Sequence, residues 1–134
     1  ILKLIEPLEA DGTLVKRGRE LIEREIEYFS VIEHDGVIFG CAALYPFPAE
    51  KMAEMACLTV NPEVQSQGDG ERMLKHMENR ARAAGFNKLF VLTTRTAHWF
   101  LKRGFVHATV DNLPKDRQHM YNWQRKSLVL IKQL

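Results

Sequence analysis

The chain has 134 residues and a mass of 15.5 kDa, and its composition, 46% hydrophobic and 27% charged with a net charge of +2, fits one globular domain with a sizeable core. No apolar run approaches the ~20 residues that span a bilayer, and no signal sequence opens the chain. The two cysteines and five histidines form no CxxC or HExxH pattern, so we expect a cytoplasmic protein without a membrane segment, a disulfide framework or a metal site.

The first third of the sequence predicts a helix followed by a hairpin. The apolar start at residues 2–5 indicates a short strand, and apolar side chains at helical spacing predict a helix over about residues 17–28. Two β-rich runs, residues 29–33 and 37–45, flank an Asp35-Gly36 turn signal. We expect these two runs to pair antiparallel.

A third antiparallel strand is expected from Met52 to Val60, where strict alternation would place Glu54 and Leu58 on the same face. The period then changes to that of a helix, which begins near Asp69 and ends at Gly85, a natural C-terminal stop.

The next strand, residues 88–93, completes a βαβ crossover, which makes the strands at 56–60 and 89–93 parallel. The rest of the chain is expected to contain a helix over about 96–103, a strand over 105–110, a polar loop with Pro114 and a last strand over 127–131. The predicted fold class is therefore α+β, with a mixed, mostly antiparallel central sheet, one parallel βαβ step and flanking helices.

The charges are distributed unevenly along the chain. Residues 1–71 carry six Lys/Arg against fourteen Asp/Glu, whereas residues 72–134 carry thirteen against three. A basic half attracts nucleic acid, a phosphorylated cofactor or an acidic substrate, since all three present anions. Charged faces that are merely solvated are the alternative.

A glycine-containing loop lies between the third strand and the long helix. It comprises Gln65, Ser66, Gln67, Gly68, Asp69, Gly70 and Glu71. Such a loop can hold a pyrophosphate without a metal, because glycines let the backbone approach closely and the helix N-terminus favours negative charge. It matches neither a Walker loop nor a dinucleotide fingerprint, and an ordinary glycine turn is the alternative.

The Q-x-x-G-x-G pattern in this context resembles the acetyl-CoA signature of the GCN5-related N-acetyltransferases (GNAT). Five longer segments look like the acetyltransferase domain of the bacterial N-acetylglutamate synthase family: GCAALYPF, EMACL, LFVLTTRTAHWF, RGF and YNWQRKS. The match covers nearly the whole chain. It implies a single GNAT domain, residues 1–134, that moves the acetyl group of acetyl-CoA to the α-amine of L-glutamate in arginine biosynthesis.

In that family an amino-acid-kinase-like domain normally precedes this one, and nothing in the sequence corresponds to it. We therefore expect the chain to be a fragment of a longer, homo-oligomeric protein.

The resemblance also implies where ligands bind. The backbone of Leu58, Thr59 and Val60 would hold the pantetheine arm, and the loop from Gln65 to Glu71 the pyrophosphate. The substrate carboxylates would be bound by Arg17, Arg117, Arg125 and Ser127, with main-chain contacts from Cys57 and Leu92. Arginine suits this task because its planar fork binds a carboxylate bidentately, although surface arginines are the alternative and Lys16 is a rival for the role of Arg17.

Glutamate's amine is mostly protonated at pH 7, so a general base is expected. Glu54 on the central strand is the best candidate, and an ordinary strand glutamate that faces solvent is the alternative. The tyrosine that the superfamily often uses to protonate the departing thiolate is replaced by Phe100. We expect Thr93, or a water it holds, to substitute, with His98 as the second choice. An acetyl-cysteine intermediate at Cys57 is disfavoured, because a small residue in a packed strand explains it.

Three alternatives to glutamate acetylation are open. The first is a GNAT enzyme that acetylates another amine, although the arginines disfavour a polyamine. The second is a basic nucleic-acid-binding module that uses Trp99, Tyr121 and Trp123 as stacking groups. Because the sequence carries no nucleic-acid motif, we expect no nucleic-acid partner. The third alternative is a domain that binds the cofactor but is silent alone.

Overall fold

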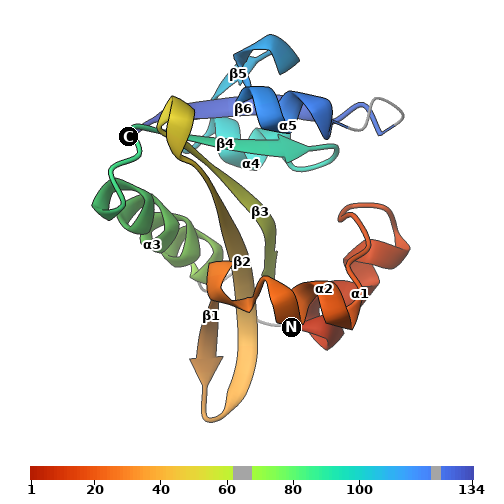
Figure 1. Cartoon of the computed structure of the whole chain (residues 1–134). Coiled ribbons are helices and arrows are strands. Elements are labelled where there is room, and N and C mark those ends of the chain that lie inside the picture. Colours follow the sequence, from red (N-terminus) through yellow and green to blue (C-terminus); the bar gives the residue numbers. More distant parts are fainter. Residues whose placement is uncertain (62–67, 122–124) are drawn as a thin grey trace.

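The computed structural model describes residues 1–61, 68–121 and 125–134. These form a six-stranded sheet in the order β1-β2-β3-β4-β6-β5, flanked by helices (Figure 1). The elements are α1 (Leu2–Ala10), α2 (Arg19–Arg24), η1 (Ile26–Tyr28), β1 (Phe29–His34), β2 (Val37–Phe47), η2 (Pro48–Glu50), β3 (Met52–Val60), α3 (Asp69–Ala83), β4 (Lys88–Thr93), α4 (Ala97–Leu101), β5 (Val106–Ala108), η4 (Val110–Asn112), α5 (Lys115–His119) and β6 (Leu128–Gln133).

The N-terminal segment is a helix, so the prediction of a strand at residues 2–5 is wrong. A four-residue apolar run fits either element, and the wider spacing of Ile1, Ile5 and Leu8 favours a helix. Ile5 is fully buried against Ile22 of α2. The helix predicted over 17–28 is present but divided into α2 and η1.

The hairpin of β1 and β2 is confirmed. Its turn residues Asp35 and Gly36 have φ of 52° and 78°, the left-handed values that a two-residue hairpin of the primed type requires. β2 continues across the sheet and pairs antiparallel with β3, as predicted.

β3 and β4 are parallel, as expected, but they pair only where Met52–Glu54 meets Lys88–Phe90. The pairing expected between 56–60 and 89–93 is therefore wrong in register, because the two strands separate after Glu54.

A second departure within β3 is a bulge at Cys57, whose φ is 58° and opposite which the β2 register shifts between Cys41 and Ala43. The bulge interrupts the alternation of faces. Leu58 packs with Met55 on the α3 side, whereas Glu54 bonds to α5 on the other side, so the two do not share a face as predicted.

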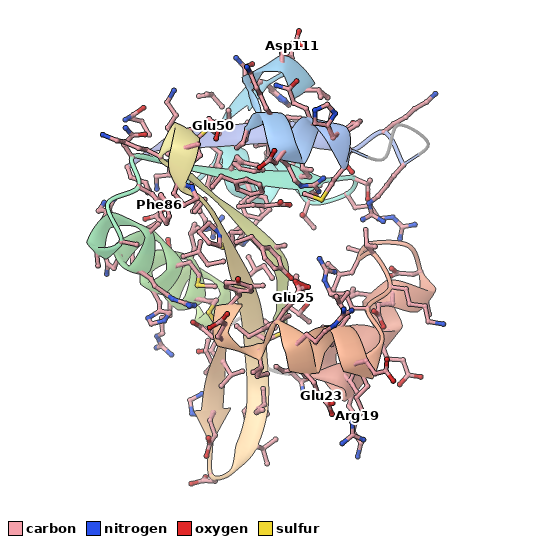
Figure 2. All side chains as sticks on the ribbon, viewed as in Figure 1. Arg19, Glu23, Glu25, Glu50, Phe86 and Asp111 are labelled. Atoms are coloured by element: carbon pink, nitrogen blue, oxygen red, sulfur yellow. The ribbon has the colours of Figure 1, made fainter. Side chains whose placement is uncertain are left out.

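α3 matches its prediction closely and packs Met73, Leu74 and Met77 against the sheet. The segment predicted as a polar loop with Pro114 instead contains η4, whose start is closed by a Thr109–Asn112 capping box, and α5. Glu50, labelled in Figure 2, accepts the backbone N–H of Lys115 at the start of α5 with an Oε2–N distance of 2.9 Å. The last strand, β6, lies between β4 and β5.

The two faces of the sheet are covered differently. One face packs against α3 and α4. On the other, α1 and α2 cover the β2–β3 side through Ile5 and Ile22, and the segment of η4 and α5 covers the β4–β6 side through Leu113 (Figure 1). The middle of this second face, between the two coverings, contains Glu54. In the described ranges no helix has the length and apolar character needed to cross a membrane.

Candidate active site

A cavity of about 440 Å³ opens where β3 and β4 separate. Its walls include Leu58, Thr59 and Val60 from β3, Leu92 and Thr93 from β4, and Gly70, Trp99, Thr13 and Leu14. The strand edge of β3 beyond Glu54 is not taken up by the ladder with β4. The cavity therefore offers a mostly apolar slot bordered by backbone groups, the surroundings that a pantetheine arm requires.

The amino end of α3 borders this cavity. Gly68 precedes the helix with φ of 82°, which a glycine adopts without strain, and a Cβ at Gly70 would lie 3.3 Å from Cζ2 of Trp99. Asp69 is buried and paired with Arg72, with an Nη1–Oδ1 distance of 2.8 Å, whereas Glu71 is exposed. The expected cofactor residues Gln65, Ser66 and Gln67 lie outside the described residues.

These observations fit acetyl-CoA. An apolar slot runs from the start of a 15-residue helix to the middle of the sheet, and Gly70 in its wall leaves room beside Trp99 that a side chain would reduce.

Glu54 and Arg117 form a buried ion pair at the middle of the second face. Arg117 donates from Nε to Oε1 at 2.6 Å and from Nη2 to Oε2 at 3.4 Å. Burial raises the pKa of Glu54, and the charge and hydrogen bonds of Arg117 oppose that rise. The two residues, which are 63 positions apart, were assigned separate roles from the sequence.

Tyr45 is a site residue that the sequence analysis missed. It lies directly opposite Glu54 in the β2–β3 ladder, and its hydroxyl donates to Glu25 Oε1 at 3.4 Å. Burial raises the pKa of Tyr45, while the charge of Arg17 lowers it, which places Arg17 near this group. The antiparallel register of β2 and β3 could have identified Tyr45 from the sequence, because the register determines which residue lies opposite Glu54.

Arg17 and Arg125 approach the same region from opposite ends of the chain. Nη1 of Arg17 donates to the Val15 carbonyl at 3.0 Å, and Nη2 of Arg125 donates to the Thr13 carbonyl at 2.5 Å. Burial lowers the pKa of Arg125, and the charges of Arg17 and Arg95 lower it further. Figure 2 shows nitrogen-tipped side chains in the space between the orange N-terminal helices and the blue C-terminal segment.

The remaining acceptor-site candidates, Cys57, Leu92 and Ser127, have main chains that are partly engaged in other contacts. The carbonyl of Cys57 accepts the Thr59 hydroxyl at 3.2 Å and the Cys41 thiol at 3.7 Å. Leu92 lines the cavity while its backbone belongs to the β4–β6 ladder. Tyr121 donates its hydroxyl to the Ser127 carbonyl at 2.5 Å.

Thr93 ends β4 at the cavity wall and organises the start of α4. Its Oγ1 accepts the backbone N–H of Thr96 at 3.1 Å and shares a hydrogen bond with Thr96 Oγ1 at 2.8 Å. Phe100 lies buried between Trp99 and Phe105, and His98 is exposed. Of these three, only Thr93 presents a polar group at the wall of the cavity.

In the part of the chain that the structure describes, no three His, Cys, Asp or Glu side chains gather to hold a metal ion. The polar chemistry found there is a buried carboxylate, several guanidinium groups and the N-terminus of a helix. The slot between the separating parallel strands lies beside these groups, since Met55 and Thr13 of its wall adjoin Glu54 and Arg125.

Comparison with known proteins identifies the family. The acetyltransferase (GNAT) family model matches residues 4–105, and the chain belongs to this family. It is 72% identical over its whole length to the amino-acid acetyltransferase of Ralstonia nicotianae, of which it spans 30%.

Solved structures of acetyltransferases also resemble this chain. The N-acetylglutamate synthase of Neisseria gonorrhoeae complexed with coenzyme A and N-acetyl-glutamate is 45% identical with a TM-score of 0.96, covering 99% of this chain and 32% of that one. A GNAT-family acetyltransferase from Staphylococcus aureus, 15% identical with a TM-score of 0.80, covers 99% of this chain and 90% of that one and shares the fold alone.

Proposed function

We propose that this chain transfers the acetyl group of acetyl-CoA to the α-amine of L-glutamate by direct amine attack, giving N-acetylglutamate and CoA. The observation that carries the proposal is that the cavity adjoins the charged groups: Met55, next to Glu54, and Thr13, whose carbonyl accepts a hydrogen bond from Arg125, both belong to its wall. The names of the relatives support it, since one is an amino-acid acetyltransferase and another binds coenzyme A and N-acetyl-glutamate. Because the chain spans only about 30% of these relatives, we propose that it is the acetyltransferase domain of a longer, homo-oligomeric protein.

We assign the cofactor to the cavity and to the N-terminus of α3. Leu58, Thr59 and Val60 contribute the strand edge that β4 leaves uncovered. Gly68 and Gly70 let the backbone of the helix start approach phosphate oxygens closely.

The reaction needs a free amine and a proton donor for the leaving thiol. When bound, acetyl-CoA supplies the activated acetyl group that the amine attacks. Glu54 receives the amine proton, directly or through one water, and Arg117 keeps Glu54 oriented and ionised in a buried position. Thr93 holds the proton for the departing thiolate, itself or through a water that its hydroxyl binds.

The acceptor's two carboxylates are assigned to Arg17, Arg125 and Ser127, with backbone contacts at Cys57 and Leu92. Arg117 orients Glu54 and thus contributes to the same site from the α5 side. A charged hydrogen bond of this kind contributes about 1.5–3 kcal/mol, which is enough to select an acidic amino acid over a neutral one.

The decisive experiment measures thiol release from acetyl-CoA with a panel of acceptors. We expect release with glutamate, much less with glutamine, and none with a polyamine or without an acceptor. Equal rates with glutamate and glutamine would contradict the carboxylate assignment, and release with a polyamine alone would overturn the proposal.

A further inference from the structure

Two arginines from the opposite side of the cavity contact Thr13 in the loop that carries Arg17. Arg125, from the segment before β6, donates Nη2 to the Thr13 carbonyl at 2.5 Å. Arg95, from the segment after β4, donates Nη1 to the Thr13 hydroxyl at 3.4 Å. Thr13 and Leu14 are themselves part of the cavity wall. The position of this loop therefore shapes the cavity.

Arg95 has a second contact on the same loop. Its Nη1 lies 3.6 Å from Oδ1 of Asp11, which also accepts the backbone N–H of Thr13 at 2.9 Å. The hydrogen bonds from Thr13, and then the charge of Arg95, lower the pKa of Asp11. Asp11 is thus a carboxylate that ties the turn together internally and is available to Arg95 at neutral pH.

The other end of the loop is fixed to α1. The backbone N–H of Arg17 donates to Oε2 of Glu9 at 2.5 Å. Residues 14–16 join this anchor to the contacts at Asp11 and Thr13, and the backbone N–H of Leu14 donates to the Leu8 carbonyl at 3.0 Å. The contacts at Asp11 and Thr13 therefore help to position the segment that leads to Arg17.

Arg125 differs from Arg95, because the proposed function assigns Arg125 to a carboxylate of the acceptor. A carboxylate makes stronger hydrogen bonds to a guanidinium than a peptide carbonyl does. An acceptor carboxylate that draws Arg125 away from Thr13 would remove one of the two fastenings across the cavity, and the contacts of Arg95 with Asp11 and Thr13 would remain.

We propose that Arg95 is a positioning residue for the acceptor: with Asp11 and the Thr13 hydroxyl it forms a clasp that keeps the loop of residues 11–17 closed while Arg125 exchanges the Thr13 carbonyl for the acceptor carboxylate. This inference rests on the proposed function. Arg95 acts through the loop, since its side chain is 55% exposed and its guanidinium contacts Asp11 and Thr13.

The kinetic test compares Arg95→Gln with the parent chain. Removing the clasp is expected to raise KM for glutamate roughly three- to tenfold, the scale of an exposed ion pair together with a modest loss of positioning, while Kd for acetyl-CoA stays within about twofold. Arg82→Gln, which removes an exposed guanidinium of α3 that contacts Asn79, is the matched control and should change neither value. Equal changes in KM and in the acetyl-CoA Kd, or no change in either, would overturn the proposal.

Two further variants separate the clasp from a general loss of charge. Thr13→Val keeps the carbonyl that Arg125 uses but removes the hydroxyl that Arg95 uses, so it should move KM in the same direction by a smaller factor. Asp11→Asn combined with Arg95→Gln should raise KM by less than the product of the two single effects. Strictly multiplicative effects would show that Arg95 and Asp11 act independently, against the clasp.

Amide hydrogen exchange keeps this inference distinguishable from the proposed function. Peptides covering residues 11–17 should exchange faster in Arg95→Gln than in the parent, whereas peptides from β3 should be unchanged. If the parent chain turns over no glutamate, the proposed function fails and this exchange difference still tests the clasp. Unchanged exchange in the loop would overturn it.

Discussion

Glu54 is subject to two opposing effects, burial and the charge of Arg117. The side chain is almost completely buried, which disfavours the ionised form, while the two hydrogen bonds from Arg117 favour it. Burial is the larger effect, so the pKa rises above its ordinary value. A carboxyl group with a raised pKa is a stronger base than an exposed one, and this matches the task of taking a proton from an ammonium group.

Glu54→Gln is expected to lower kcat by roughly 10²- to 10⁴-fold at pH 7, because the amide keeps the size and hydrogen bonding of Glu54 but cannot accept the proton. The loss should shrink toward pH 10, where the acceptor amine is already deprotonated. Steady-state rates of the two proteins between pH 7 and 10 check this, with Glu33→Gln on the exposed part of β1 as the control. A loss of the same size at every pH would mean that Glu54 only positions other groups.

The same group predicts a pH dependence of stability. Since the folded pKa of Glu54 lies above 4.5, the folded protein binds this proton more tightly than the unfolded chain. Its contribution to the free energy of unfolding is full below pH 4.5 and is lost as the pH rises through the folded pKa, by up to about 1.4 kcal/mol per pH unit. Glu54→Gln lacks this loss, so its stability relative to the parent should rise from pH 4.5 upward. Urea unfolding of both proteins at several pH values measures the difference, and a pH-independent difference contradicts the interpretation.

At the scale of elements, the two ends of α3 offer a matched pair of glycines. Gly68 at the start and Gly85 after the end have φ of 82° and 89°, and a Cβ at either position would meet no atom of the described residues within 4 Å. An alanine at each position is thus strained to a similar extent by the left-handed backbone alone, by about 1–2 kcal/mol. Only Gly68 lies at the end assigned to the cofactor.

We therefore expect Gly68→Ala and Gly85→Ala to destabilise the protein by similar amounts and to differ in acetyl-CoA binding. Gly68→Ala should weaken acetyl-CoA several-fold, because the backbone cannot then present its N–H groups without strain, and Gly85→Ala should leave the affinity unchanged. Isothermal titration of both variants checks this. If the two lost affinity equally, the α3 N-terminus would have no special part in cofactor binding.

The helices and strands differ in how well the sequence alone predicted them. α3 and the β1–β2 hairpin were predicted because their signals, an apolar stripe and an Asp-Gly turn, are local. The strand predicted at residues 2–5 is helical, because a four-residue apolar run is ambiguous alone and the apolar spacing that extends to Leu8, with the packing of Ile5 against Ile22, decides for a helix. The bulge at Cys57 was equally invisible, since a left-handed residue within a strand is set by its neighbours across the sheet.

The candidate site also combines residues that the sequence suggested with contacts that only the fold reveals. Glu54 and Thr93 were chosen for their places on predicted strands and Arg125 from the resemblance to the family, and the roles of all three stay predictions. The pairing of Glu54 with Arg117 depends on α5, which the sequence analysis took for a loop. Arg95 lies in one of the quoted segments but received no role, because its partners on residues 11–13 are more than 80 positions away.

At the scale of the whole molecule, the uneven charge distribution has a structural explanation. Among the described residues, four ion pairs join the acidic first half to the basic second half: Glu54 with Arg117, Asp11 with Arg95, Asp69 with Arg72, and Glu71 with Arg103. The first joins β3 to α5, the second joins the loop after α1 to the segment after β4, and the other two lie at the start of α3. The basic half is thus partly neutralised inside one domain, which weakens the case for a nucleic-acid partner.

Ligand-dependent unfolding tests this conclusion on the entire domain. A ligand that binds only the folded state stabilises it by about 2.7 kcal/mol at a concentration of 100 Kd, and the shift grows with the logarithm of concentration. We expect acetyl-CoA to raise the thermal midpoint in this way, because the cavity between β3 and β4 exists only when both strands are placed by the fold. A single-stranded oligonucleotide at the same concentration and at 0.15 M salt should leave the midpoint unchanged. The opposite pattern would favour the nucleic-acid module, whereas stabilisation by acetyl-CoA without turnover of any amine would identify a domain that binds its cofactor but needs further chain for catalysis.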